Sequence, residues 1–128
     1  MKILIYHSNV TEIENLFRSG MKLPRACQIK AADNYQGFDR NLRSCLSGQG
    51  VIVFYAQEKR DLDYLKSKIA VTGDFKIIIS VKDSSLYSTA FSLYPIYVQI
   101  WNRKNTDLNI ISILNKMVQN RFHQESAS

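Results

Sequence analysis

Residues 51–55 read Val-Ile-Val-Phe-Tyr, an uninterrupted run of β-branched and aromatic residues. A run of this kind predicts a strand that is buried on both faces, as in a parallel sheet covered by helices. Leu62, Leu65 and Ile69 follow at helical spacing, and Gly73 closes the segment. Strand and helix together form one βα unit, and the rest of the chain is expected to repeat this unit.

Four more runs of β-forming residues predict the other strands. These runs are residues 2–7, Cys27–Ala32, Phe75–Ser80 and Ile96–Ile100. The run at Cys27–Ala32 is the least β-prone of them, whereas Phe75–Ser80 has three isoleucines at its centre.

Caps and stops bound a helical pattern after each strand. The expected N-caps are Ser8 or Asn9, Asp33-Asn34, Ser84-Ser85 and Thr106-Asp107, and the expected stops are Gly20, Gly48-Gln49-Gly50 and Pro95. The expected inward positions are Val10, Ile13 and Phe17; Phe38, Leu42 and Cys45 or Leu46; Leu86, Ala90 and Leu93; and Ile110 or Ile111, Leu114, Met117 or Val118, and Phe122.

Short strands that alternate with helices predict a three-layer α/β/α sandwich around a five-stranded parallel sheet. Parallel neighbours need crossover connections, which place helices on both faces of the sheet. The expected strand order is 2-1-3-4-5. We expect a single domain over residues 1–122 and a flexible tail over residues 123–128.

Composition indicates an ordinary soluble globular chain, with 45% hydrophobic and 22% charged residues. No apolar run approaches the ~18 residues of a membrane-spanning helix, and the N-terminus lacks the layout of a signal peptide. Cys27 and Cys45 have no C-x-x-C partner and no neighbouring histidine, so we expect reduced thiols rather than a disulfide or a zinc site. These features predict a cytoplasmic protein.

The formal charge of +6 at pH 7 is compatible with anionic partners such as nucleic acid. However, basic residues are spread from Lys2 to Arg121, and the densest groups, Lys59-Arg60 and Arg103-Lys104, are short. A solvated basic surface is the favoured interpretation, since nucleic-acid binding would rest on charge alone.

In open parallel sheets, ligands bind beyond the carboxyl ends of the strands. The residues expected at those ends are polar, namely His7-Ser8-Asn9, Asp33-Asn34-Tyr35, Ala56-Gln57-Glu58, Ser80-Val81-Lys82-Asp83 and Trp101-Asn102-Arg103-Lys104. A nucleotide site would need glycines directly after a strand. Every glycine between the expected elements falls instead between a helix and the next strand, which excludes a Rossmann or Walker phosphate loop.

Over residues 1–122 the chain resembles a response-regulator receiver, a flavodoxin-like α/β domain. The opening strand at Lys2–Tyr6, the Ala31-Ala32-Asp33 segment before a helix, and Ser80 at a strand end carry the resemblance. In receivers an acidic pair after the first strand binds Mg²⁺, an Asp at the end of the third strand accepts the phosphoryl group, a Ser or Thr ends the fourth strand and a Lys ends the fifth.

The chain departs from the receiver pattern at every charged position. His7 and Ser8 occupy the acidic-pair positions, Tyr55 or Ala56 falls at the phospho-acceptor, and Gln99 or Asn102 most nearly matches the lysine. Mg²⁺ binding and phosphoryl transfer both need carboxylates, so aspartyl phosphorylation is not expected. We therefore predict no catalytic, phospho-acceptor or metal-binding residue and no cofactor. These departures resemble those of pseudo-receivers, which work through protein contacts.

The leading hypothesis is accordingly a non-enzymatic regulatory or signalling module. The alternative is a binder, or an enzyme, for a small anion such as a nucleotide or phosphate, using a rim at the strand ends. The residues of that rim would be His7, Ser8, Ser80, Lys82 and Arg103. A Ser-His catalytic arrangement around His7 would also need an orienting acid and an oxyanion site, which the sequence does not identify.

Aromatic residues gather around the fourth helix and fifth strand at Phe91, Tyr94, Tyr97 and Trp101. A strand at the edge of a sheet leaves part of such a group near the surface, and exposed aromatics favour protein interfaces. Receivers commonly use the face formed by the fourth helix, fifth strand and fifth helix for dimerisation or partner binding. The resemblance therefore implies a homodimer or a partner-binding face here.

Overall fold

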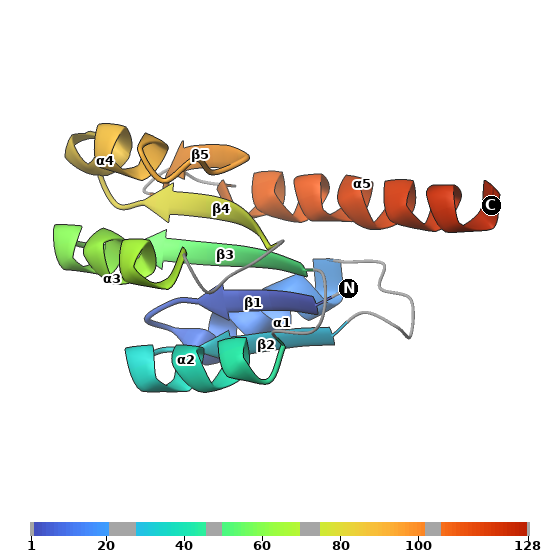
Figure 1. Cartoon of the computed structure of the whole chain (residues 1–128), viewed down its shortest axis with the longest axis horizontal. Helices are drawn as coiled ribbons and strands as arrows, with labels where there is room; N and C mark the ends of the chain where they lie inside the picture. The colour runs from blue at the N-terminus through green and yellow to red at the C-terminus, as the bar shows by residue number, and fades with distance from the viewer. Residues whose placement is uncertain (1, 21–27, 46–49, 70–74, 102–105, 128) are drawn as a thin grey trace.

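The structure is a computed structural model of the 128-residue chain. It describes residues 2–20, 28–45, 50–69, 75–101 and 106–127, with the backbone alone for residues 106 and 119–127. The strands are β1 (Lys2–Tyr6), β2 (Gln28–Ala32), β3 (Gly50–Ala56), β4 (Lys76–Val81) and β5 (Tyr97–Ile100). The helices are α1 (Val10–Gly20), α2 (Tyr35–Arg43), α3 (Lys59–Ile69), the 3₁₀ turn η1 (Ser84–Leu86), α4 (Tyr87–Phe91) and α5 (Thr106–Ala127) (Figure 1).

All five strands are parallel, and their order in the sheet is β2-β1-β3-β4-β5. The predicted strand order is therefore confirmed. Every residue of the central strand β3 is buried, as its apolar run predicts for a strand covered on both faces. β2 and β5 form the two edges of the sheet.

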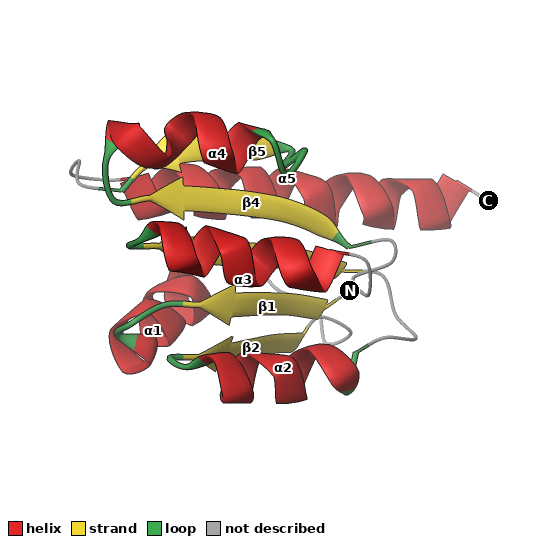
Figure 2. Cartoon of the chain, turned by 60° about the vertical axis from the view of Figure 1, so that its left-hand side comes forward, coloured by secondary structure: helices red, strands yellow, loops and turns green. Residues whose placement is uncertain are grey.

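Helices cover both faces of the sheet, which confirms the predicted three-layer sandwich. Figure 2 shows α2, α3 and α4 in front of the strands, with α1 and α5 behind them. Phe38, Leu65 and Ala90 belong to the core between the sheet and the front helices. Ile13 and Leu114 belong to the core on the other face. These buried residues are among the inward positions that the 3.6-residue periodicity of the helices predicts.

The N-cap of α2 is a predicted residue, whereas the N-cap of η1 is a different residue from the predicted ones. The Asn34 side chain accepts the backbone N–H of Gly37 at 2.7 Å, as expected of an N-cap. Before η1 the cap is Asp83 rather than the predicted Ser84-Ser85, because the Asp83 carboxylate accepts the Ser85 N–H at 2.9 Å. An aspartate one residue upstream thus provides the acceptor that we expected from a serine.

The glycine expected to end a helix before β3 has another role. Gly50 is the first residue of β3, and a Cβ at this position would lie 2.4 Å from the carbonyl oxygen of Lys2. Close approach of two strands, rather than a helix stop, explains this glycine. At the other end of the chain, α5 continues to Ala127, so residue 122 is not a boundary of secondary structure.

Some predicted features lie outside the described residues: Cys27, Leu46, Gly48, Gln49, Gly73 and the side chain of Phe122. Cys45 is a buried free thiol. No helix within the described ranges combines the length and the hydrophobicity that a membrane crossing requires.

Candidate functional site

The strand register brings three residues that the receiver resemblance singled out into one row at the carboxyl edge of the sheet. Tyr55 of β3 pairs with Ser80 of β4, and Ser80 pairs with Gln99 of β5. Since side chains on paired residues point to the same face, these three share the face covered by α1 and α5. Of the residues considered for the receiver's acceptor and lysine positions, Tyr55 and Gln99 therefore share a face with Ser80, Ala56 does not, and Asn102 lies outside the described residues.

Aromatic rings fill the edge of the sheet on this face. The His7 ring lies 4.5 Å from the Tyr55 ring and 4.8 Å from the Trp101 ring, both in edge-to-face geometry. Tyr55 and Trp101 are 5.3 Å apart, also edge-to-face. The Tyr55 hydroxyl donates to Asp107 Oδ1 at 2.6 Å. We call His7, Tyr55, Trp101 and Asp107 the strand-end cluster.

Tyr55 is a core residue rather than a reactive group. Its side chain is almost fully buried. Burial raises the pKa of its hydroxyl well above the ordinary value, and the hydrogen bond to Asp107 adds to this shift. The phenol therefore stays protonated and acts as a hydrogen-bond donor that joins β3 to the first turn of α5.

His7 is fixed as a neutral ring. Its Nδ1 accepts the backbone N–H of Asn9 at 2.8 Å, so the neutral tautomer carries its proton on Nε2. Burial lowers the pKa of His7 below 6.5, although the carboxylates of Asp107 and Glu12 act in the opposite direction. No hydrogen bond joins His7 to Ser8 or Ser80 in the described structure, so a Ser-His pair is not assembled.

This burial predicts a pH-dependent stability. The unfolded chain takes up a proton on His7 below about pH 6.5, while the folded chain resists it, so stability should fall as pH decreases through that window. The free energy of unfolding, measured by urea denaturation, should differ less between about pH 7.5 and about pH 5.5 for His7→Asn than for the wild type. Replacing the other histidine, in His123→Asn, should leave the wild-type difference intact. Equal differences in all three proteins would contradict the assignment of His7 as a buried neutral group.

A cavity of about 300 Å³ opens beside the strand-end cluster. His7, Ser8, Trp101, Glu12 and Asp107 are among its lining residues. The charged groups in this lining are the carboxylates of Glu12 and Asp107, which do not suit an anionic ligand. Within the described ranges, no three His, Cys, Asp or Glu side chains come together as a metal site.

The described residues of the predicted anion rim have different surroundings. His7 and Ser8 line the cavity, and the Ser8 hydroxyl accepts a hydrogen bond from Gln57 Nε2 at 2.7 Å. Ser80 is fully buried, with Gln99 Nε2 at 3.5 Å from its hydroxyl. Lys82 is exposed, and Arg103 lies outside the described residues. These observations on the described residues do not favour the small-anion alternative.

A second polar cluster, which the sequence did not suggest, lies on the opposite face of the sheet at the same edge. The buried Asp61 carboxylate accepts the backbone N–H groups of Gln57 at 2.9 Å and Glu58 at 3.1 Å. It also accepts the Tyr35 hydroxyl. The position of Asp61 in the first turn of α3 is a recognisable capping signal. Tyr35 could not be assigned to it without the tertiary structure.

The aromatic residues of the fourth helix and fifth strand separate into two places. Phe91 and Tyr94 are 52% and 92% exposed, and Ile96 beside them is 47% exposed. Tyr97 is half-buried and lines a groove along β5. Trp101 belongs to the strand-end cluster instead, because its ring packs against His7 and Tyr55.

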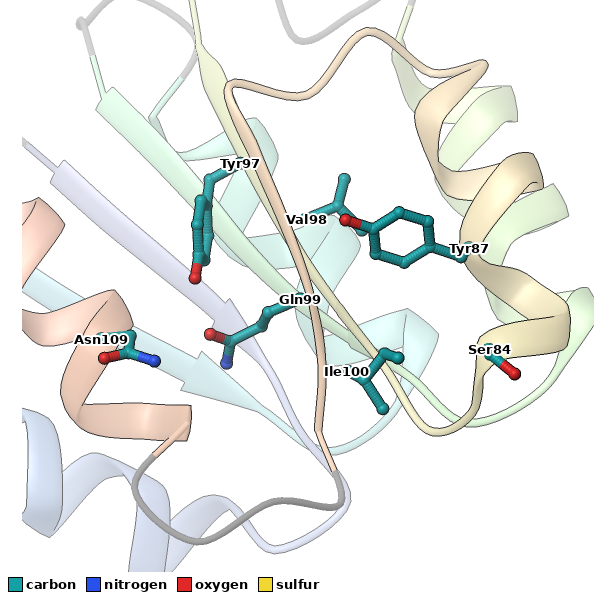
Figure 3. A pocket seen from close by; sticks show the side chains of 7 residues that line it. All are labelled: Ser84, Tyr87, Tyr97, Val98, Gln99, Ile100 and Asn109. Atoms are coloured by element: carbon teal, nitrogen blue, oxygen red, sulfur yellow. The ribbon is translucent and has the colours of Figure 1, made fainter.

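The groove along β5 has a volume of about 450 Å³. Figure 3 shows its lining, with Tyr87 from α4 on one side, Asn109 from α5 on the other and β5 between them. Tyr97 and Gln99 point toward the α5 side, and Val98 toward the α4 side. The complete lining is Ser84, Tyr87, Tyr97, Val98, Gln99, Ile100 and Asn109, none of which carries a charge.

Comparison with known proteins supports the fold. No family model and no curated protein matches the chain. A solved structure from Burkholderia pseudomallei K96243, described as a "putative pilus assembly-related protein", is similar with a TM-score of 0.64 and 10% sequence identity. The similarity covers 93% of this chain and 90% of that protein. At this identity the match concerns architecture alone, so the chain shares a flavodoxin-like three-layer α/β fold with that protein.

Proposed function

We propose that this chain is a cytoplasmic, non-enzymatic regulatory module with a receiver-like fold that works through protein contacts and is not phosphorylated. One observation carries the proposal: a buried phenol and a buried imidazole stand at the positions that match, under the receiver resemblance, the acceptor aspartate and one residue of the acidic pair. Tyr55 stands at the acceptor position as a buried hydrogen-bonded phenol. His7 stands at an acidic-pair position as a buried imidazole.

The chemistry of these residues supports the absence of phosphorylation. Mg²⁺ prefers an octahedral set of oxygen ligands with carboxylates among them, and phosphoryl transfer relies on the metal to offset negative charge. The nearby carboxylates of Glu12 and Asp107 come from the first turns of α1 and α5 rather than from strand ends. Asp107 is also engaged by the Tyr55 hydroxyl.

The exposed aromatic surface supports a role in protein contacts. Phe91, Tyr94 and Ile96 are exposed hydrophobic residues within six positions of the chain, between the end of α4 and the start of β5. Receivers use the face formed by their fourth helix, fifth strand and fifth helix for dimerisation or partner binding. From Ser84 to Trp101 the sequence contains no Asp, Glu, Lys or Arg, in a chain with 22% charged residues. Depletion of charge together with exposed aromatics is the compositional signature of an interface core.

Treatment with acetyl phosphate and Mg²⁺ tests the proposal. We expect no mass increase corresponding to a phosphoryl group, under conditions in which a receiver with an intact acidic pair is modified. The single tryptophan, Trp101, lines the cavity beside the strand-end cluster, so its fluorescence would report Mg²⁺ binding there. We expect Mg²⁺ to leave this emission unchanged. A hydroxylamine-labile phosphoryl group or a saturable Mg²⁺ response would overturn the proposed function.

A further inference from the structure

The outer edge of β2 is contacted by a charged side chain of α1. β2 forms one edge of the sheet, with β1 on one side and no strand described on the other. Figure 2 shows this edge with α2 in front of it and α1 behind it. An edge strand has a row of backbone N–H and C=O groups that can pair with a strand of another chain, and proteins commonly block such edges with charged side chains.

The hydrogen bonds between β1 and β2 identify the backbone groups that face outward. The N–H of His7 donates to the carbonyl oxygen of Ala32 at 3.1 Å. Ala32 therefore directs its backbone groups toward β1, and so does Lys30, two residues earlier. Because this direction alternates along a strand, the N–H and C=O groups of Ile29 and Ala31 face the outer edge.

Arg18 of α1 contacts one of these outward groups. Its Nη2 donates to the carbonyl oxygen of Ile29 at 3.1 Å. Glu14, one turn earlier in α1, holds the same guanidinium, because its Oε1 accepts Arg18 Nε at 3.0 Å and lies 2.8 Å from Nη2. The guanidinium is thus bonded to α1 and to the strand edge at once. A lysine ammonium has no rigid fork of donors that could make both contacts in this way.

The position of these contacts affects access to the edge more than the stability of the fold. The side chains of Arg18 and Glu14 are 52% and 33% exposed, and ion pairs exposed to solvent contribute little to stability. A strand that pairs with β2, however, needs the carbonyl oxygen of Ile29 as an acceptor. It therefore has to displace the guanidinium first.

A second cation lies on the other face of the same strand. The Nζ of Lys30 donates to Oγ of Ser44, the residue directly after α2, at 3.0 Å. β2 thus has Arg18 on its α1 side and Lys30 on its α2 side. In a two-fold symmetric pairing of two β2 edges, the same patch of each copy faces the other, which brings these cations together. Like charges that face each other across paired strands are destabilising.

We propose that Arg18, held by Glu14, closes the outer edge of β2 and prevents two copies of the chain from pairing through it. The guanidinium acts in two ways: it occupies an outward carbonyl oxygen, and it adds a positive charge where a second copy would approach. The inference concerns an edge of the sheet that the proposed function does not use, so the two can fail independently.

Replacing Arg18 tests the inference. In sedimentation velocity over a range of protein concentrations, Arg18→Ala should dimerise with a dissociation constant at least about tenfold lower than that of the wild type, because a hydrogen bond from a charged group no longer has to be broken in each copy. Arg18→Lys should lie between the two, since it keeps the charge without the forked contact. Lys66→Ala is the matched control: it removes one exposed cation from the last turn of α3 and should associate as the wild type does.

Amide hydrogen exchange locates the contact and shows that each variant is folded. The amide of Ala32, which faces β1, should exchange slowly in every protein. The amides of Ile29 and Ala31 should exchange rapidly in the wild type and slowly in the Arg18→Ala dimer.

Three results would overturn the inference. The first is equal association of Arg18→Ala and Lys66→Ala. The second is association of Arg18→Ala that leaves the amides of Ile29 and Ala31 in rapid exchange, because another surface would then be responsible. The third is slow exchange of both amides in the wild type, since the edge would then already be covered by other means.

Discussion

Replacing Tyr55 with alanine is expected to lower the free energy of unfolding by about 3–5 kcal/mol, the usual cost of truncating a buried aromatic side chain. The Tyr55 ring is almost fully buried and packs edge-to-face against His7 and Trp101. The variant loses both ring contacts, the hydrogen bond to Asp107 and the volume that fills the carboxyl edge of the sheet. Urea denaturation followed by far-ultraviolet circular dichroism measures the loss.

Two matched variants separate the contributions. Tyr55→Phe keeps the ring and removes only the hydroxyl that donates to Asp107, so it should lose about 1 kcal/mol. Tyr94→Ala removes a tyrosine that is 92% exposed and should change stability by less than about 0.5 kcal/mol. If Tyr55→Ala were no more destabilising than Tyr94→Ala, the strand-end cluster would not be packed core, and the region could still accommodate a ligand.

Because Tyr55 is packed in the core, replacing it with the acceptor aspartate of receivers would affect the stability of the fold. An aspartate introduced at position 55 would replace a packed phenol by a charge in a buried site, which is costly without a compensating partner. The neighbouring carboxylate of Asp107 would add like-charge repulsion. Under the proposed function, a single substitution toward the receiver pattern is therefore expected to destabilise the fold before it could permit phosphorylation.

Hydrophobic pattern predicts the fold well because each element contains a sufficient local signal. The apolar run at residues 51–55 predicts a strand buried on both faces, and β3 is buried at every position. Helical spacing likewise predicts the inward positions Phe38 and Leu114. The prediction that Gly50 helps to end a helix was wrong, because a local sequence pattern cannot show that the backbone of β1 lies against this residue.

The site is less predictable because it depends on register and on residues distant in sequence. From the sequence alone, Tyr55 and Ala56 were equal candidates for the acceptor position, because one step along a strand reverses the face of a side chain. Only pairing with Ser80 assigns Tyr55 to the same face. Asp107 reaches Tyr55 from the first turn of α5, and no motif joins two residues so far apart.

Asp61→Ala is expected to lower the free energy of unfolding by about 2–4 kcal/mol, which combines loss of a helix cap with loss of hydrogen bonds to a charged group. The Asp61 carboxylate accepts the N–H groups of Gln57 and Glu58, and its other oxygen accepts the Tyr35 hydroxyl. These bonds fix the loop after β3 to α2. Removal leaves the two N–H groups without their acceptor, so their hydrogen exchange should accelerate.

The same bonds extend to the loop after β1, because Gln57 Nε2 donates to the Ser8 hydroxyl. Asp61→Ala should therefore also loosen the position of Ser8, whereas Tyr35→Phe should cost only about 1 kcal/mol and leave the loop amides protected. Asp63→Ala is the matched control, since Asp63 lies exposed on the same helix and should change stability by less than about 0.5 kcal/mol. Equal stability of the Asp61→Ala and Asp63→Ala variants would show that this buried carboxylate does not hold the strand-end loops together.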